Sequence, residues 1–121
     1  MNAEQYLWQS RILVREDRYS VYKVRTFPPE FVAAIADPSE KTVVAVTGSL
    51  LPELVIEEEP GWKILTFEAE LPFELVGFLA IVATRLAEAG ISVFALSAYS
   101  TDHIMVKEEK LERALEVLGA R

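Results

Sequence analysis

LPFELVGFLAIVATRLAEAGISVFALSAYSTDHIMV, residues 71–106, is the most apolar and most clearly punctuated stretch of the chain. Apolar residues recur every three or four positions over Leu75–Leu86, and this spacing predicts a helix. Pro72 and the acidic Glu74 favour the start of that helix, because proline presets φ and an acid complements the helix dipole. Gly90 ends it, since glycine takes the left-handed C′ conformation without strain.

Residues 91–98 follow as a predicted strand that is apolar on both faces, and such a strand needs cover on both sides. Residues 102–107 form a second strand, paired to the first across a short turn. A strand over 62–68 precedes this stretch, and an amphipathic helix over 108–118 follows it. The order of elements in the second half is therefore β-α-β-β-α, which predicts an antiparallel sheet with both helices on one face.

The first half of the chain is predicted to repeat this plan in degenerate form. Pro28 opens a predicted short helix that runs to Ile35, and PPEFV at 28–32 resembles PFELV at 72–76. The acidic run at 57–59 is interpreted as a solvated turn. The expected strands of this half cover residues 10–15, 19–24 and 41–47. The fold class is thus α+β, with two ferredoxin-like β-α-β sandwiches in tandem over residues 1–59 and 60–121.

Composition excludes several classes of protein. The 121 residues include no cysteine, so disulfides and thiolate metal sites are excluded. The net charge of −7 argues against nucleic-acid binding, which depends on clustered Lys and Arg. No stretch reaches the roughly 18 uninterrupted apolar residues of a membrane span, and the first residues lack the pattern of a signal peptide. We expect a cytoplasmic protein without a cofactor.

The second half resembles the ACT domain, a small ligand-binding module of amino-acid metabolic enzymes. The resemblance rests on GWKILTF at 61–67, on the stretch 71–106 and on KEEKLERALEVL at 107–118. Its most telling part is the pattern GIS-x-F-x-(L/I)-S-x-Y-x-T-D, carried by Gly90 to Asp102. In more detail, these segments are similar in sequence to a small bacterial family of tandem ACT-like proteins related to the cytosolic arginine sensors of animals.

The resemblance implies an amino-acid site where the loop into the first helix meets a strand of a neighbouring ACT unit. On this chain it implicates the helix entrance Pro72–Gly77 and the strand end Ser97–Asp102. A helix N-terminus offers free N–H groups to a carboxylate, and Asp102 is expected to accept hydrogen bonds from an ammonium group. The ligand-binding residues predicted in this way are Phe73, Glu74, Leu75, Val76, Gly77, Ser97, Tyr99, Ser100, Thr101 and Asp102.

The chain departs from the common ACT pattern at the helix entrance. Many ACT domains have a glycine directly after the loop proline, where this chain has Phe73 followed by Glu74. Two alternatives remain open: the ligand is absent, or it binds in another pose with Glu74 gripping its cationic part. Residues 100–102 also have the composition of an ordinary tight turn. Gly77 falls inside the predicted helix, where close packing is the favoured explanation.

We therefore predict a non-catalytic, regulatory, amino-acid-binding module that forms a homodimer. The alternative is a structural or protein-interaction protein with a vestigial pocket. An enzyme is not favoured, because the lone His103 is interpreted as a satisfied polar residue and nothing positions a nucleophile or a metal.

Overall fold

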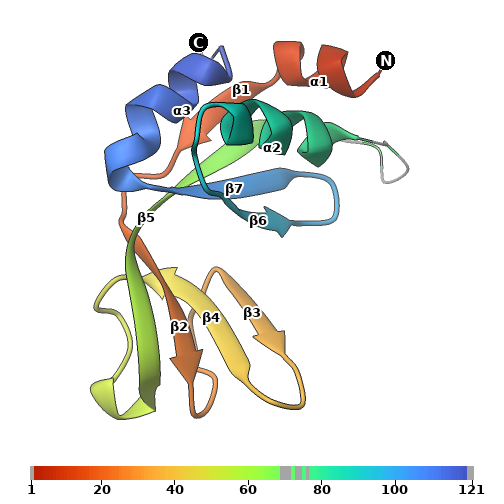
Figure 1. Ribbon diagram of the computed structural model, residues 1–121. Helices are drawn as coiled ribbons and strands as arrows, with labels where there is room; N and C mark the ends of the chain where they lie inside the picture. The colour runs from red at the N-terminus through yellow and green to blue at the C-terminus, as the bar shows by residue number, and fades with distance from the viewer. Residues whose placement is uncertain (1, 69–71, 73–74, 76, 120–121) are drawn as a thin grey trace. The chain divides into compact units, whose positions relative to one another are not determined.

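The computed structural model describes residues 2–68, 72, 75 and 77–119, which divide into two compact units (Figure 1). Unit 1 consists of Met1–Arg15 and Lys63–Arg121, and unit 2 is Glu16–Trp62. This division differs from the predicted one at 59/60, because the first fifteen residues belong with the C-terminal part. No helix in the described residues is long and apolar enough to cross a membrane.

Unit 1 is a small α+β domain with helices on one face of a sheet (Figure 1). Its strands lie in the order β1-β5-β7-β6, with β1–β5 and β6–β7 antiparallel. The last part of β5 belongs to this unit and the first part to unit 2. The elements of unit 1 are α1 (Ala3–Gln9), β1 (Arg11–Val14), β5 (Val55–Glu68), α2 (Phe78–Glu88), β6 (Phe94–Ser97), β7 (Asp102–Lys107), η2 (Glu108–Lys110) and α3 (Leu111–Val117).

The core of unit 1 lies between this sheet and its helices. Phe67 from β5 and Phe78 from α2 meet edge to face, with ring centroids 5.2 Å apart. Every third or fourth residue of α2 faces this core, and Val82 and Leu86 are fully buried. The other buried members are Ala3, Leu7, Leu65, Ile91, Ile104, Val106, Ala114 and Leu118. Burial of this many apolar side chains is the main force that holds the unit together.

The end of α2 confirms the prediction made from Gly90. The Gly90 N–H donates to the Ala87 carbonyl at 2.9 Å, and the Ile91 N–H donates to the Leu86 carbonyl at 2.9 Å. Gly90 has a φ of 74°, and these paired bonds form a Schellman motif that satisfies the last carbonyls of the helix.

The start of α2 differs from the prediction at Gly77. This residue lies at the N-cap, before the helix, with a left-handed φ of 87°. A Cβ atom there meets nothing within 4 Å, so close packing does not explain the glycine. The positive φ explains the glycine, because a residue with a side chain is strained in the left-handed region. The predicted start near Glu74 lies outside the described residues.

The strand predicted over residues 91–98 is shorter than expected and lies at the edge of the sheet. It is β6, which pairs with β7. Phe94 and Leu96 are half-buried, whereas Ala95 and Ser97 are exposed. Within the single chain, one face of this strand is therefore left uncovered.

Unit 2 consists of strands in the order β3-β4-β2-β5, all paired antiparallel. Its own core contains Tyr22, Val24, Val43, Ala45 and Leu50. The further elements of unit 2 are β2 (Tyr19–Val24), β3 (Ala33–Ala36), β4 (Lys41–Val46) and η1 (Pro52–Leu54).

The helix predicted from Pro28 to Ile35 is wrong. Pro29 disfavours helical φ and ψ at the residue before it, and Val32 already donates its N–H to the Val44 carbonyl at 2.8 Å. The chain therefore enters β3 where a helix was expected. All residues of unit 2 are described and none lies in an α-helix, so this unit is not a β-α-β sandwich.

The acidic run at 57–59 lies within β5, although a turn was predicted there. Glu58 is opposite Tyr22 on β2, and its carboxylate accepts a hydrogen bond of 2.7 Å from the Ser20 hydroxyl. Pairing with β2 therefore outweighs the local turn composition.

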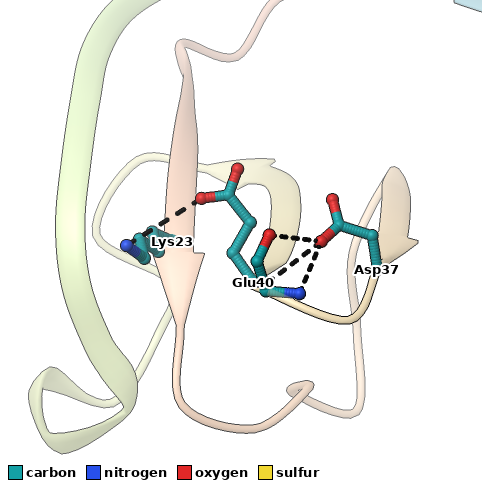
Figure 2. A network of polar contacts seen from close by, with 4 residues as sticks. Lys23, Asp37 and Glu40 are labelled. Carbon is teal, nitrogen blue, oxygen red and sulfur yellow. Dashed lines mark hydrogen bonds and ion pairs between the residues drawn. The ribbon is translucent and has the colours of Figure 1, made fainter.

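The turn between β3 and β4 is organised by Asp37 (Figure 2). Its carboxylate accepts hydrogen bonds from the Ser39 hydroxyl at 2.8 Å and from the N–H groups of Ser39 and Glu40. These bonds lower the pKa of Asp37. Lys23 reaches Glu40 across the strands at 3.9 Å, which is a surface pair of small energetic weight.

The edge-to-face contact at Phe78 yields a stability prediction. Phe78→Ala is expected to destabilise the protein by about 3–5 kcal/mol, because it removes a buried ring and leaves a cavity. The control Leu13→Ala changes a half-exposed side chain on β1 and is expected to cost less than about 1 kcal/mol. Urea unfolding followed by circular dichroism measures both. Equal losses would contradict the assignment of Phe78 to the core.

Candidate functional site

The hollow beside the turn between β6 and β7 brings the two predicted site segments together. It has a volume of about 240 Å³, and we call it the β6–β7 cavity. The helix entrance contributes Pro72 and Leu75. The hairpin contributes Ser97, Ala98, Tyr99, Ser100, Thr101 and Asp102. Two stretches about 25 residues apart in the sequence thus line one cavity.

Local backbone bonds hold both walls of this cavity. The Leu75 N–H donates to the Pro72 carbonyl at 3.0 Å, which forms a turn ahead of α2. On the other side, the Ala98 N–H donates to the Thr101 carbonyl at 2.9 Å. Ser97 and Asp102 then face each other as the first pair of the β6–β7 ladder. The hairpin register therefore places a hydroxyl and a carboxylate on the same wall.

The polar groups of the cavity suit a ligand that both donates and accepts hydrogen bonds. Asp102 is half-buried, and its carboxylate has no hydrogen bond or ion pair to the part of the chain that the structure describes. Ser97, Ser100 and Thr101 add hydroxyl groups, which can act in either sense. Tyr99 lies at the rim with 84% of its surface exposed.

His103 connects this hairpin to β5. Its Nδ1 atom lies 2.9 Å from the Thr66 hydroxyl, and its Nε2 atom lies 3.4 Å from the Thr101 hydroxyl of the cavity wall. Burial and the nearby Arg15 guanidinium lower the pKa of His103, and the Asp102 carboxylate opposes this shift. The interpretation of His103 as a satisfied polar residue agrees with these contacts.

The remaining predicted residues are Gly77, Phe73, Glu74 and Val76. Gly77 is described and does not line the cavity. Phe73, Glu74 and Val76 fall outside the described residues. Among the described residues no group of three or more His, Cys, Asp or Glu side chains is arranged to hold a metal ion.

A second hollow in unit 1 was not predicted from the sequence. It lies among the ends of α1, α2 and α3 and has a volume of about 390 Å³. The helix α1 itself was missed, although it carries a readable signal. Asn2 and Gln5 form a capping box, in which each side chain accepts a hydrogen bond from the other residue's N–H.

Comparison with known proteins agrees with this geometry. The fold of unit 1 defines a small α+β domain of the ferredoxin-like kind. The ACT-domain family matches residues 57–120, which is more than half of the chain. The chain belongs to the ACT-domain family. None of the curated proteins matches it.

Several solved structures share the fold. A Vibrio cholerae protein of unknown function is 27% identical, with a TM-score of 0.78 over 98% of this chain and 94% of its own. An Agrobacterium tumefaciens protein is 20% identical, with a TM-score of 0.79 over 91% and 87%. The regulatory subunit of aspartate kinase from Thermus thermophilus is 10% identical, with a TM-score of 0.66 over 92% and 95%.

The environment of His103 predicts a pH dependence of stability. Its pKa is lower in the folded protein than its unfolded value of about 6.5. Between these two pKa values the unfolded chain binds a proton that the folded chain does not. The contribution of His103 to the free energy of unfolding is therefore lost as the pH falls from about 6.5 through the folded pKa.

The variant His103→Gln isolates this effect, since it removes the titrating group and leaves all carboxylates unchanged. Urea unfolding between about pH 7 and pH 5 is expected to show a steeper loss of stability for the parent protein than for the variant. Parallel curves would show that His103 does not titrate differently in the two states.

Proposed function

We propose that the chain is a non-catalytic regulatory module that binds a free amino acid in the β6–β7 cavity. The observation that supports this most is the convergence of Pro72 and Leu75 with residues 97–102 in a unit of the ACT-domain family. ACT domains are regulatory modules, and the similar solved structures include an aspartate kinase regulatory subunit.

The size and the polar groups of the cavity fit such a ligand. Its volume of about 240 Å³ lies below the roughly 300–1,000 Å³ of sites for drug-sized molecules. Asp102 is the acceptor for the α-ammonium group or for a basic side chain. The hydroxyls of Ser100 and Thr101 are donors for the carboxylate. The resemblance to arginine sensors makes arginine the first ligand to test.

The proposal includes a homodimer, in which a second copy of the chain completes the site. Unit 2 contains no α-helix, so a neighbouring ACT unit has to come from another chain. The strand β6 lies at the edge of its sheet next to the cavity and presents Ala95 and Ser97 to solvent. Sedimentation equilibrium tests this part, and a monomer at all concentrations would contradict it.

Exposed apolar side chains favour the second candidate function, a protein-interaction module. Tyr99 is 84% exposed, and Phe31 and Ile35 of unit 2 are each about half exposed. Tyrosine and phenylalanine are enriched at protein interfaces. Purification of the tagged protein from lysate distinguishes the two functions. If the protein carries no amino acid and retains one stoichiometric protein partner, the result supports the second function.

The ligand hypothesis predicts the behaviour of Asp102→Asn. Calorimetric titration of the parent protein with each of the twenty amino acids is expected to identify a ligand whose binding depends on Asp102. Asp102→Asn should weaken its binding by roughly tenfold or more, because a charge-assisted hydrogen bond is lost. The melting temperature should stay the same, since this carboxylate has no bonded partner in the described chain.

The matched control is Asp17→Asn in unit 2, which changes the same chemical group away from the cavity. It is expected to leave the affinity unchanged. Absence of heat for all twenty amino acids would overturn the proposed function. Unfolding of Asp102→Asn would instead identify this residue as a structural part of the turn.

A further inference from the structure

The larger hollow of unit 1 has the chemistry of a second ligand site. We call it the helix-side cavity, and its volume is about 390 Å³. It shares no lining residue with the β6–β7 cavity. Its lining residues are Leu7, Trp8, Ser10, Ile12, Arg85, Glu116, Val117, Leu118 and Gly119.

Two opposite charges line this cavity without pairing with each other. Arg85 comes from α2 and Glu116 from α3, and among the described residues no ion pair joins them. Arg85 is paired with Glu4 at 3.6 Å, and Glu116 is paired with Arg113. The Arg113–Glu116 pair is largely exposed and the Arg85–Glu4 pair is partly exposed. Pairs that remain open to solvent contribute only about 0–1 kcal/mol. A ligand can therefore replace Glu4 or Arg113 as the ion-pair partner with little loss of folding free energy.

Trp8 supplies an apolar surface to the same cavity. Its side chain is 57% exposed, although its neighbour Leu7 and the facing Leu118 are almost fully buried. An indole is a large apolar group, and covering it releases the water that its exposed ring orders. The half-buried Ile12 adds a second apolar contact.

We propose that the helix-side cavity binds a small zwitterion with an apolar side group, that is, a free α-amino acid of the aromatic or large aliphatic kind. The Arg85 guanidinium binds the carboxylate and the Glu116 carboxylate binds the ammonium group. The side group covers Trp8. This site is additional to the one under the proposed function and does not depend on it.

A ligand with a single charge fits the cavity less well than a zwitterion. A simple carboxylate satisfies Arg85 but lies beside the negative Glu116, on a protein whose net charge is −7. A simple amine satisfies Glu116 but lies beside Arg85. Only a ligand with both charges forms an ion pair with each of the two residues while remaining neutral overall.

Trp8 provides a direct reporter for the test. The chain has two tryptophans, Trp8 and Trp62, so the variant Trp62→Phe leaves the indole of the helix-side cavity as the only one. Titration of this variant with L-phenylalanine is expected to change its tryptophan fluorescence in a saturable way. The analogues 3-phenylpropionate and phenethylamine each lack one charged group and should bind at least about tenfold more weakly.

Variants of the two charged residues complete the test. Arg85→Gln and Glu116→Gln, each made in the Trp62→Phe protein, should weaken L-phenylalanine binding by roughly tenfold or more. The control Glu112→Gln removes a charge from the same helix as Glu116, at a position that does not line the cavity. It should leave the affinity unchanged.

Three results would overturn the inference. The first is the absence of any fluorescence change when the Trp62→Phe protein is titrated to millimolar concentration with L-phenylalanine and, separately, with the large aliphatic amino acids. The second is binding that Arg85→Gln and Glu116→Gln leave intact. The third is a calorimetric signal for L-phenylalanine that Asp102→Asn abolishes and Arg85→Gln does not, which would place this ligand in the β6–β7 cavity.

Discussion

The pairing of β1 with β5 is the constraint on which unit 1 depends. Arg11–Val14 lies antiparallel to residues 65–68, and Ile12 and Val14 pack against the core. The pairing joins the first fifteen residues of the chain to its second half, with all of unit 2 between them. Loop-closure entropy rises only slowly with loop length, so an intervening segment of this size adds little to the cost of the contact. The β1–β5 pairing also gives unit 1 the strand that borders β5 on the side away from β7.

Local sequence signals predicted the elements that local physics decides. Gly90 marked the end of α2 correctly, because a Schellman motif needs a residue at positive φ. The strands at 19–24 and 102–107 were predicted with their observed bounds from β-branched and aromatic residues. Each of these signals lies within about ten residues of the structure that it specifies.

The wrong predictions concern segments whose structure depends on contacts with residues far away in the sequence or on exact backbone angles. PPEFV at 28–32 resembles the entrance of α2, but pairing of Val32 with β4 makes the segment extended. The acidic run at 57–59 has a turn's composition, yet β2 pairs with it. The candidate site followed the same rule. Residues 97–102 were proposed from their local sequence, and they line the β6–β7 cavity. The helix-side cavity combines residues from both ends of the chain and has no local signature.

The helix α2 links stability to both cavities of unit 1. Phe78, Val82 and Leu86 hold it on the sheet, and each is almost fully buried. The turn that carries Leu75 lies just before this helix, and Arg85 lies in its last turn. A ligand in either cavity binds the folded unit and not the unfolded chain, so it stabilises the protein by an amount that grows with its concentration. Because the buried side chains of α2 position both cavities, loosening of α2 should weaken binding at both proposed sites together. Changes at Asp102 or Glu116 should act on one proposed site each.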